Sequence, residues 1–163
     1  MAVSFNFRRF LALFRPDLYT PFELALRDIA HRRYEDAIAK LDQILADPQL
    51  SADDRAAAAN KRGVALVELD RRQEARAAFE TALASVPKFV PALVNLGNLH
   101  LEAGETEQAI RYYERAVLSD EDYALAHHNL GVAYKRLGRT GDSVRELRKA
   151  HRLEGRVVRK PRK

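Results

Sequence analysis

The side chains with the most obvious chemical potential in this chain are its five histidines, because an imidazole can bind a metal ion or transfer a proton near neutral pH. Two of them, His127 and His128, are adjacent in the sequence. Consecutive residues on a helix point about 100° apart, so this pair cannot easily share one metal ion. There is no cysteine, which excludes disulfides, thiolate catalysis and cysteine-ligated metal centres. We therefore predict no metal site.

Motifs that carry enzyme chemistry are also missing from the sequence. It contains no phosphate loop ending in Gly-Lys-Ser/Thr, no Gly-x-Ser-x-Gly elbow, no His-Glu-x-x-His pair and no calcium loop. We interpret His100 and His127 as packing residues of helices and His128 as a residue of a surface groove. The prediction is a protein that is not an enzyme and has no cofactor and no small-molecule substrate.

The elements that hold these residues repeat along the chain. A small residue recurs at intervals of 38, 34 and 34 residues, at Ala37, Ala75, Ala109 and Ser143. Four positions after each comes a large residue, at Leu41, Phe79, Tyr113 and Leu147. A glycine precedes each of the last three small residues by twelve positions, at Gly63, Gly97 and Gly131. Small and large residues that alternate on one helical face are typical of closely packed helix pairs.

These residues resemble the tetratricopeptide repeat (TPR), whose 34-residue signature has Leu-Gly and an aromatic residue in its first helix and Ala, aromatic and Ala in its second. The resemblance implies an all-α fold, a right-handed α-solenoid of about four helix-turn-helix units. The units are expected at 18–51, 56–89, 90–123 and 124–155. The first is degenerate, because Leu24-Ala25 stands in place of Leu-Gly and four extra residues around PQLSADDR follow it. Helices are expected near 21–32, 34–46, 52–69, 72–84, 90–103, 106–118, 124–137 and 140–153.

The resemblance further implies that the first helix of each unit lines a concave groove, which binds a peptide or helix of a partner protein. The groove positions of the family correspond to Asn60, Lys61, Asn95, Asn98, Leu101, His128, Asn129, Lys135 and Arg136. An asparagine amide can both donate to and accept from the backbone of an extended peptide. Asparagine is also a mediocre helix former, which favours a binding role over that of a solvated helix face. Chaperone-binding members clamp a C-terminal carboxylate, but Asn60, Val64 and Leu125 replace three clamp residues, so we do not expect that ligand.

An apolar N-terminal segment precedes the repeats at 1–17. Val3, Phe7, Phe10, Leu11 and Phe14 form one face at helical spacing, a docking face from which the arginines of the segment are excluded. Three interpretations stay open: an amphipathic helix packed on the first repeat, one that docks on another subunit, or one that lies on an anionic membrane. No secretory signal and no membrane span is recognisable. We expect a cytoplasmic protein, with peripheral membrane attachment as the open alternative.

The opposite end of the chain is strongly basic. Residues 135–163 carry twelve Lys/Arg and three acidic residues, a net charge of +9, whereas 34–134 carries −7. We expect a basic tail over 156–163 that is too short to form a covering helix; its charges are Arg156, Arg159, Lys160, Arg162 and Lys163. It could meet an acidic protein surface, anionic lipid or nucleic acid, or simply keep the chain in solution. An uncovered last repeat together with the N-terminal segment predicts a homo-oligomer joined through its ends.

Two functions follow from these patterns. The first is a non-catalytic adaptor that binds a protein segment in its groove. The alternative is a structural subunit of a larger assembly, either homo-oligomeric or attached to a membrane, which makes its contacts through the N-terminal helix and the basic tail.

Overall fold

The computed structural model describes the backbone of residues 20–159 and the side chains of residues 20–155. This part of the chain consists of eight helices and contains no strand. The helices are α2 (Pro21–Ala30), α3 (Tyr34–Leu45), α4 (Ala52–Glu68), α5 (Arg72–Ser85), α6 (Val90–Glu102), α7 (Thr106–Ser119), α8 (Ala124–Arg136) and α9 (Thr140–Arg159). The expected docking face at 1–17 and the last four residues lie outside the described residues.

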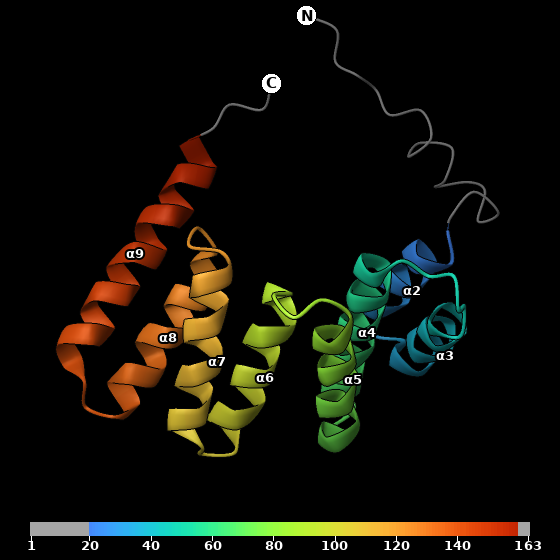
Figure 1. Cartoon of the computed structure of the whole chain (residues 1–163), viewed down its shortest axis with the longest axis horizontal. Helices are drawn as coiled ribbons and strands as arrows, with labels where there is room; N and C mark the ends of the chain where they lie inside the picture. Colours follow the sequence, from blue (N-terminus) through green and yellow to red (C-terminus); the bar gives the residue numbers. More distant parts are fainter. Residues whose placement is uncertain (1–19, 160–163) are drawn as a thin grey trace, which may run out of the picture.

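The eight helices form four pairs that follow one another along the molecule, from α2 and α3 at one end to α8 and α9 at the other (Figure 1). Each helix packs mainly on its neighbours in sequence. The first helices of consecutive pairs also contact each other, α2 with α4, α4 with α6 and α6 with α8. They therefore form one continuous layer of an α-solenoid, as the repeat spacing predicts.

Glycine allows the close approach of the two helices within a pair. An added Cβ at Gly97 would stand 2.4 Å from Cε1 of Tyr113, and one at Gly63 would stand 2.4 Å from Cε1 of Phe79. Both rings are essentially inaccessible to solvent. The large residue of the second helix therefore packs directly on the backbone of the first, which explains the twelve-residue and sixteen-residue spacings that link these positions.

Local residues mark the ends of several helices. Thr20 and Glu23 form a capping box at the start of α2, in which the Glu23 N–H donates to Thr20 Oγ1 and the Thr20 N–H donates to Glu23 Oε2. Gly104 and Gly138 turn the chain with φ of 82° and 72°. Asp70 takes the equivalent position of the second repeat with φ of 57°.

The end of α9 differs from the sequence-based expectation. The helix does not stop near residue 153 but continues through Gly155 to Arg159, so the expected helix end near residue 153 is wrong. One glycine costs a helix only about 1 kcal/mol relative to alanine. Arginines near the C-terminal end of a helix interact favourably with its dipole.

A buried carboxylate secures the turn between α2 and α3. Asp28 is 5 % exposed, accepts a hydrogen bond from Arg33 Nε at 3.0 Å and lies 2.6 Å from Lys40 Nζ. Burial alone raises the pKa of this carboxyl, but the hydrogen bonds and charges of Lys40 and Arg33 outweigh burial, and the pKa lies below its ordinary value. The group therefore stabilises the first repeat while it is ionised.

This cluster predicts an acid-dependent loss of stability. An unfolded aspartate has a pKa of about 3.9. Because the folded pKa is lower, the contribution of Asp28 is complete above about pH 5 and is lost as the pH falls through the folded pKa. Asp28→Asn should cost about 1 kcal/mol at pH 7, and the difference from wild type should shrink toward pH 3 in urea titrations. Asp36→Asn, whose carboxylate is largely exposed and lies 3.7 Å from Arg33 Nε, is the control and should lower stability at pH 7 much less.

Candidate protein-binding groove

Asparagine amides link the first helices of neighbouring pairs. Asn95 Nδ2 on α6 donates to Asn60 Oδ1 on α4 at 2.9 Å. Asn129 Nδ2 on α8 donates to Asn98 Oδ1 on α6, also at 2.9 Å. Four of the predicted groove residues thus form two interhelical hydrogen bonds. The cost of asparagine in a helix is therefore partly offset inside the protein itself.

Asn98 is the most constrained of the four. Its Oδ1 accepts a second hydrogen bond, of 2.7 Å, from the hydroxyl of the fully buried Tyr113. Burial raises the pKa of that hydroxyl well above its usual value, so the phenol stays protonated and donates. With two donors on one oxygen, the Asn98 carbonyl is saturated, and its role is to hold α6, α7 and α8 together.

Asn95 and Asn129 retain unused hydrogen-bonding capacity. Both side chains are half-buried, and each uses one N–H in its interhelical bond. Within the described part of the chain, no residue bonds to the Oδ1 or the second N–H of either amide. Their spacing of 34 residues places them at equivalent positions of two repeats, so the amides form a regular row.

The predicted groove residues also differ in how far they are exposed to solvent. Asn60 and Leu101 are buried, at 5 % and 9 % exposed, and offer little surface to a partner. Lys61 is half-buried, while His128, Lys135 and Arg136 are exposed. One Arg136 N–H donates to the Leu101 carbonyl at 2.9 Å and fixes the guanidinium between α6 and α8. The α8 end of the predicted groove is thus polar and cationic.

Two of the histidines, His100 and His127, are packing residues. His127 is 5 % exposed, with Nδ1 2.8 Å from Glu146 Oε2 and Nε2 3.0 Å from the Glu121 carbonyl. His100 is equally buried and stacks on Tyr112 with ring centroids 5.2 Å apart. Both therefore pack inside the solenoid, as interpreted from the sequence. Across the described residues, no three His, Asp or Glu side chains are grouped closely enough to hold a metal ion.

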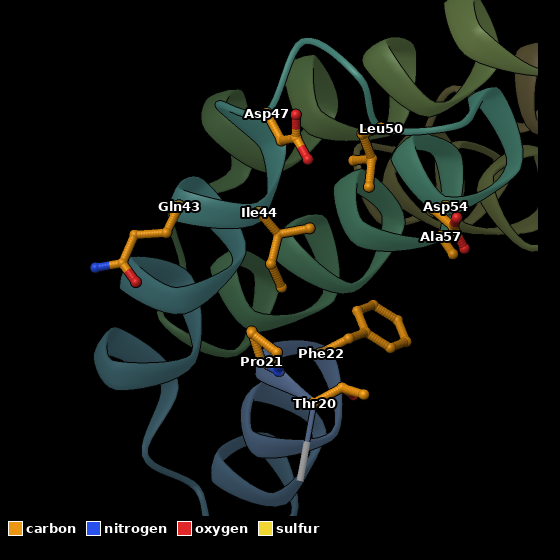
Figure 2. A pocket seen from close by; sticks show the side chains of 9 residues that line it. All are labelled: Thr20, Pro21, Phe22, Gln43, Ile44, Asp47, Leu50, Asp54 and Ala57. Carbon is orange, nitrogen blue, oxygen red and sulfur yellow. The ribbon is translucent and has the colours of Figure 1, made fainter. Parts of the chain in front are cut away.

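A cavity of about 560 Å³ lies beside the first repeat, and sequence analysis did not anticipate it. Figure 2 shows its lining, which comes from α2, α3, the loop that follows α3 and the start of α4. Thr20, Pro21, Phe22, Gln43, Ile44, Asp47, Leu50, Asp54 and Ala57 line it. The interval of 38 residues between Ala37 and Ala75, four longer than the others, was the available signal, because the longer loop contributes Asp47 and Leu50 to the lining.

Comparison with known families agrees with this architecture. Two family models described as tetratricopeptide repeat match residues 22–89 and 124–155, and one described as TPR repeat matches residues 97–138. The matches cover all four helix pairs. The chain belongs to the tetratricopeptide-repeat family. As a TPR protein it is a protein-interaction module, and such repeats are in general non-catalytic.

Solved TPR structures superpose over most of the chain. A crystal structure of MamA has a TM-score of 0.72 at 22 % identity and covers 94 % of this chain and 88 % of its own. BtubC from P. vanneervenii has a TM-score of 0.73 at 21 % identity, covering 91 % and 69 %. The second TPR of Spaghetti (RPAP3), bound to the HSP90 peptide SRMEEVD, has a TM-score of 0.59 at 19 % identity, covering 62 % and 94 %. At these identities the likeness establishes the fold.

The described helices do not meet the requirements of a membrane span. Over residues 20–159, no helix combines the length and the apolar character needed to cross a bilayer.

Proposed function

We propose that this TPR protein holds a peptide or helix of a partner protein on the layer formed by α4, α6 and α8. The observation that carries the proposal is the pair of half-buried amides, Asn95 and Asn129, at equivalent positions of adjacent repeats. Each is fixed by one interhelical hydrogen bond and keeps an acceptor and a donor for a ligand backbone. Preorganised polar groups of this kind bind with a smaller loss of side-chain entropy.

Charge in the groove favours an acidic partner segment at its α8 end. His128, Lys135 and Arg136 are exposed there, and Arg136 is held in place by the Leu101 carbonyl. A ligand with acidic side chains toward α8 fits these three residues, because complementary charges orient a bound segment.

The ligand that we propose differs from that of the RPAP3 repeat. Chaperone-binding TPR proteins clamp a terminal carboxylate, and three of the clamp positions here are Asn60, Val64 and Leu125. Asn60 is buried in its bond with Asn95, and Leu125 is half exposed and apolar. We therefore favour an internal segment over a free C-terminus, with side-chain carboxylates supplying the negative charge.

The test is substitution of the two amides. The partner is first isolated by affinity capture from the source cell and identified by mass spectrometry. Asn95→Ala with Asn129→Ala should then weaken binding by about tenfold or more in calorimetric titration, because each amide loses its bonds to the ligand.

A matched control separates binding from stability. Asn60→Ala breaks the same α4–α6 hydrogen bond but leaves the Asn95 amide in the groove, so it should change affinity much less. If the double variant binds as tightly as wild type, the groove is not the site.

The alternative function, a structural subunit, has support of its own at α9. Arg145, Arg148 and Arg152 are exposed and follow one line along the helix, since they are spaced by three and four residues. Helical backbone to Arg159 carries positions 156 and 159 along the same line. Val144 on the same open side is 39 % exposed. α9 thus offers a basic, partly apolar surface at the end of the solenoid.

The two proposed functions predict opposite results for two double variants. A structural subunit loses its assembly when Arg148 and Arg152 are replaced by glutamine and keeps it when Asn95 and Asn129 are replaced. Binding through α9 should also weaken steeply with added salt. Sedimentation checks the proposed homo-oligomer, and a purely monomeric chain at high micromolar concentration would contradict it.

A further inference from the structure

The cavity beside the first repeat has a mixed lining that suits a particular kind of occupant. Phe22, Ile44 and Leu50 are half-buried and face the same space from α2, α3 and the loop after α3 (Figure 2). Asp47 and Asp54 are exposed and also contribute to its lining. An apolar floor beside two carboxylates favours an apolar segment that carries cations.

The chain itself enters at this cavity. Thr20 and Pro21 belong to the lining, so the segment 1–19 is joined to the rest of the chain at the edge of the cavity. Phe14 lies six residues before Thr20, and a chain of that length reaches at most about 20 Å. A return of the preceding residues toward the cavity therefore requires no long linker.

The composition of residues 1–17 complements the lining. The apolar face of the segment includes Phe10 and Phe14, while Arg8, Arg9 and Arg15 lie off that face. Pockets of about 300–1,000 Å³ accommodate drug-sized molecules, so a cavity of about 560 Å³ has room for two aromatic side chains.

We propose that the cavity formed by α2, α3 and α4 is the docking site of the N-terminal segment of the same chain, with Phe10 and Phe14 entering it. The arginines of the segment then lie near Asp47 and Asp54. This contact covers the junction of the first and second repeats, where α2, α3 and α4 meet. It gives the segment a role within the chain, distinct from the partner surface on α4, α6 and α8.

The absence of tryptophan from the sequence makes this proposal directly testable. Phe14→Trp introduces a single fluorophore into the full chain. Its emission should be blue-shifted and protected from acrylamide. Adding Leu50→Asp to the cavity should shift the emission to the red and increase the quenching constant several-fold. The matched control is Leu118→Asp on α7, at a side chain that is 82 % exposed, and it should change neither value.

An emission that is solvent-like from the start, or that ignores Leu50→Asp, would overturn the proposal. Circular dichroism of the Leu50→Asp variant confirms that the helices persist. If that variant unfolds, disulfide cross-linking between introduced cysteines is the second test. It is practicable because the chain has no cysteine of its own.

Cross-linking identifies whose segment fills the cavity. Arg9→Cys with Gln43→Cys should oxidise to a monomer with an internal disulfide, whereas Arg9→Cys with Leu118→Cys should not. A cross-linked dimer would mean that the segment of a second copy occupies the cavity, and failure to cross-link would mean that another partner or solvent does. Either result contradicts docking within the same chain.

Discussion

Replacing Tyr113 by alanine is expected to lower the free energy of unfolding by about 4 kcal/mol. The ring is completely buried and packs on the backbone of α6 at Gly97. Its hydroxyl donates to Asn98, which also accepts from Asn129 on α8. Truncation therefore leaves a cavity and removes the bond between α6 and α7 that positions the Asn98 carbonyl, the acceptor for Asn129 of the fourth repeat. Urea denaturation followed by circular dichroism measures the loss.

Tyr113→Phe separates the two contributions. It keeps the ring and removes only the hydrogen bond to Asn98, so it should cost about 1 kcal/mol. In a solenoid each repeat is stabilised mainly by its neighbours, so a damaged central interface can also split one cooperative transition into two. We expect a lower m-value for Tyr113→Ala than for Tyr113→Phe. Equal losses for the two variants would show that packing of the ring contributes little.

The pattern around Tyr113 also explains why the fold could be predicted from the sequence. Ala109, Tyr113 and Ala116 lie on one face of α7, and the same small and large types recur 34 residues earlier at Ala75, Phe79 and Ala82. Burial of a whole helical face imposes that period, so the order of residue types alone indicates the helix pairs and their turns. The expected helix starts agree as well, and side-chain caps mark those of α2 and α4, at Thr20 and Ser51.

Features that depend on contacts between repeats are not visible in the sequence. Asn95 bonds to a residue 35 positions earlier, and Asn129 to one 31 positions earlier. Neither separation equals the 34-residue period, so no repeat pattern indicates these pairs. The two sequence separations differ because Asn60 and Asn98, in successive repeats, occupy repeat positions that are one helical turn apart. Which asparagines pair depends on the relative positions of α4, α6 and α8.

The groove residues show the same division. Family positions correctly indicated the helices that form the shared layer, but they did not separate exposed side chains such as His128 from buried ones such as Asn60. Exposure depends on the neighbouring repeat. Arg136, for example, reaches across from α8 to the Leu101 carbonyl and helps to cover α6. Sequence position alone therefore indicates the helix layer that carries the predicted groove residues. It does not indicate which of their side chains are accessible.

Gly97→Ala is expected to lower the free energy of unfolding by about 2 kcal/mol, although alanine is the better helix former. The gain in helix propensity is about 1 kcal/mol. Overpacking a rigid site costs up to about 3 kcal/mol, and the new Cβ would stand 2.4 Å from Cε1 of Tyr113, a ring with no room to move. Gly155→Ala on α9 is the control, because a Cβ there meets nothing and should leave stability unchanged or raised.

A double-mutant cycle attributes this cost to the ring. If the clash with Tyr113 is the cause, Gly97→Ala should cost little once Tyr113 is alanine, because the methyl group then occupies part of the vacated space. The combined loss should fall below the sum of the two single losses by about 2 kcal/mol, within the range observed for residues in contact. Strict additivity would place the cost elsewhere in α6 and would remove the physical reason for pairing glycine with an aromatic residue sixteen positions later.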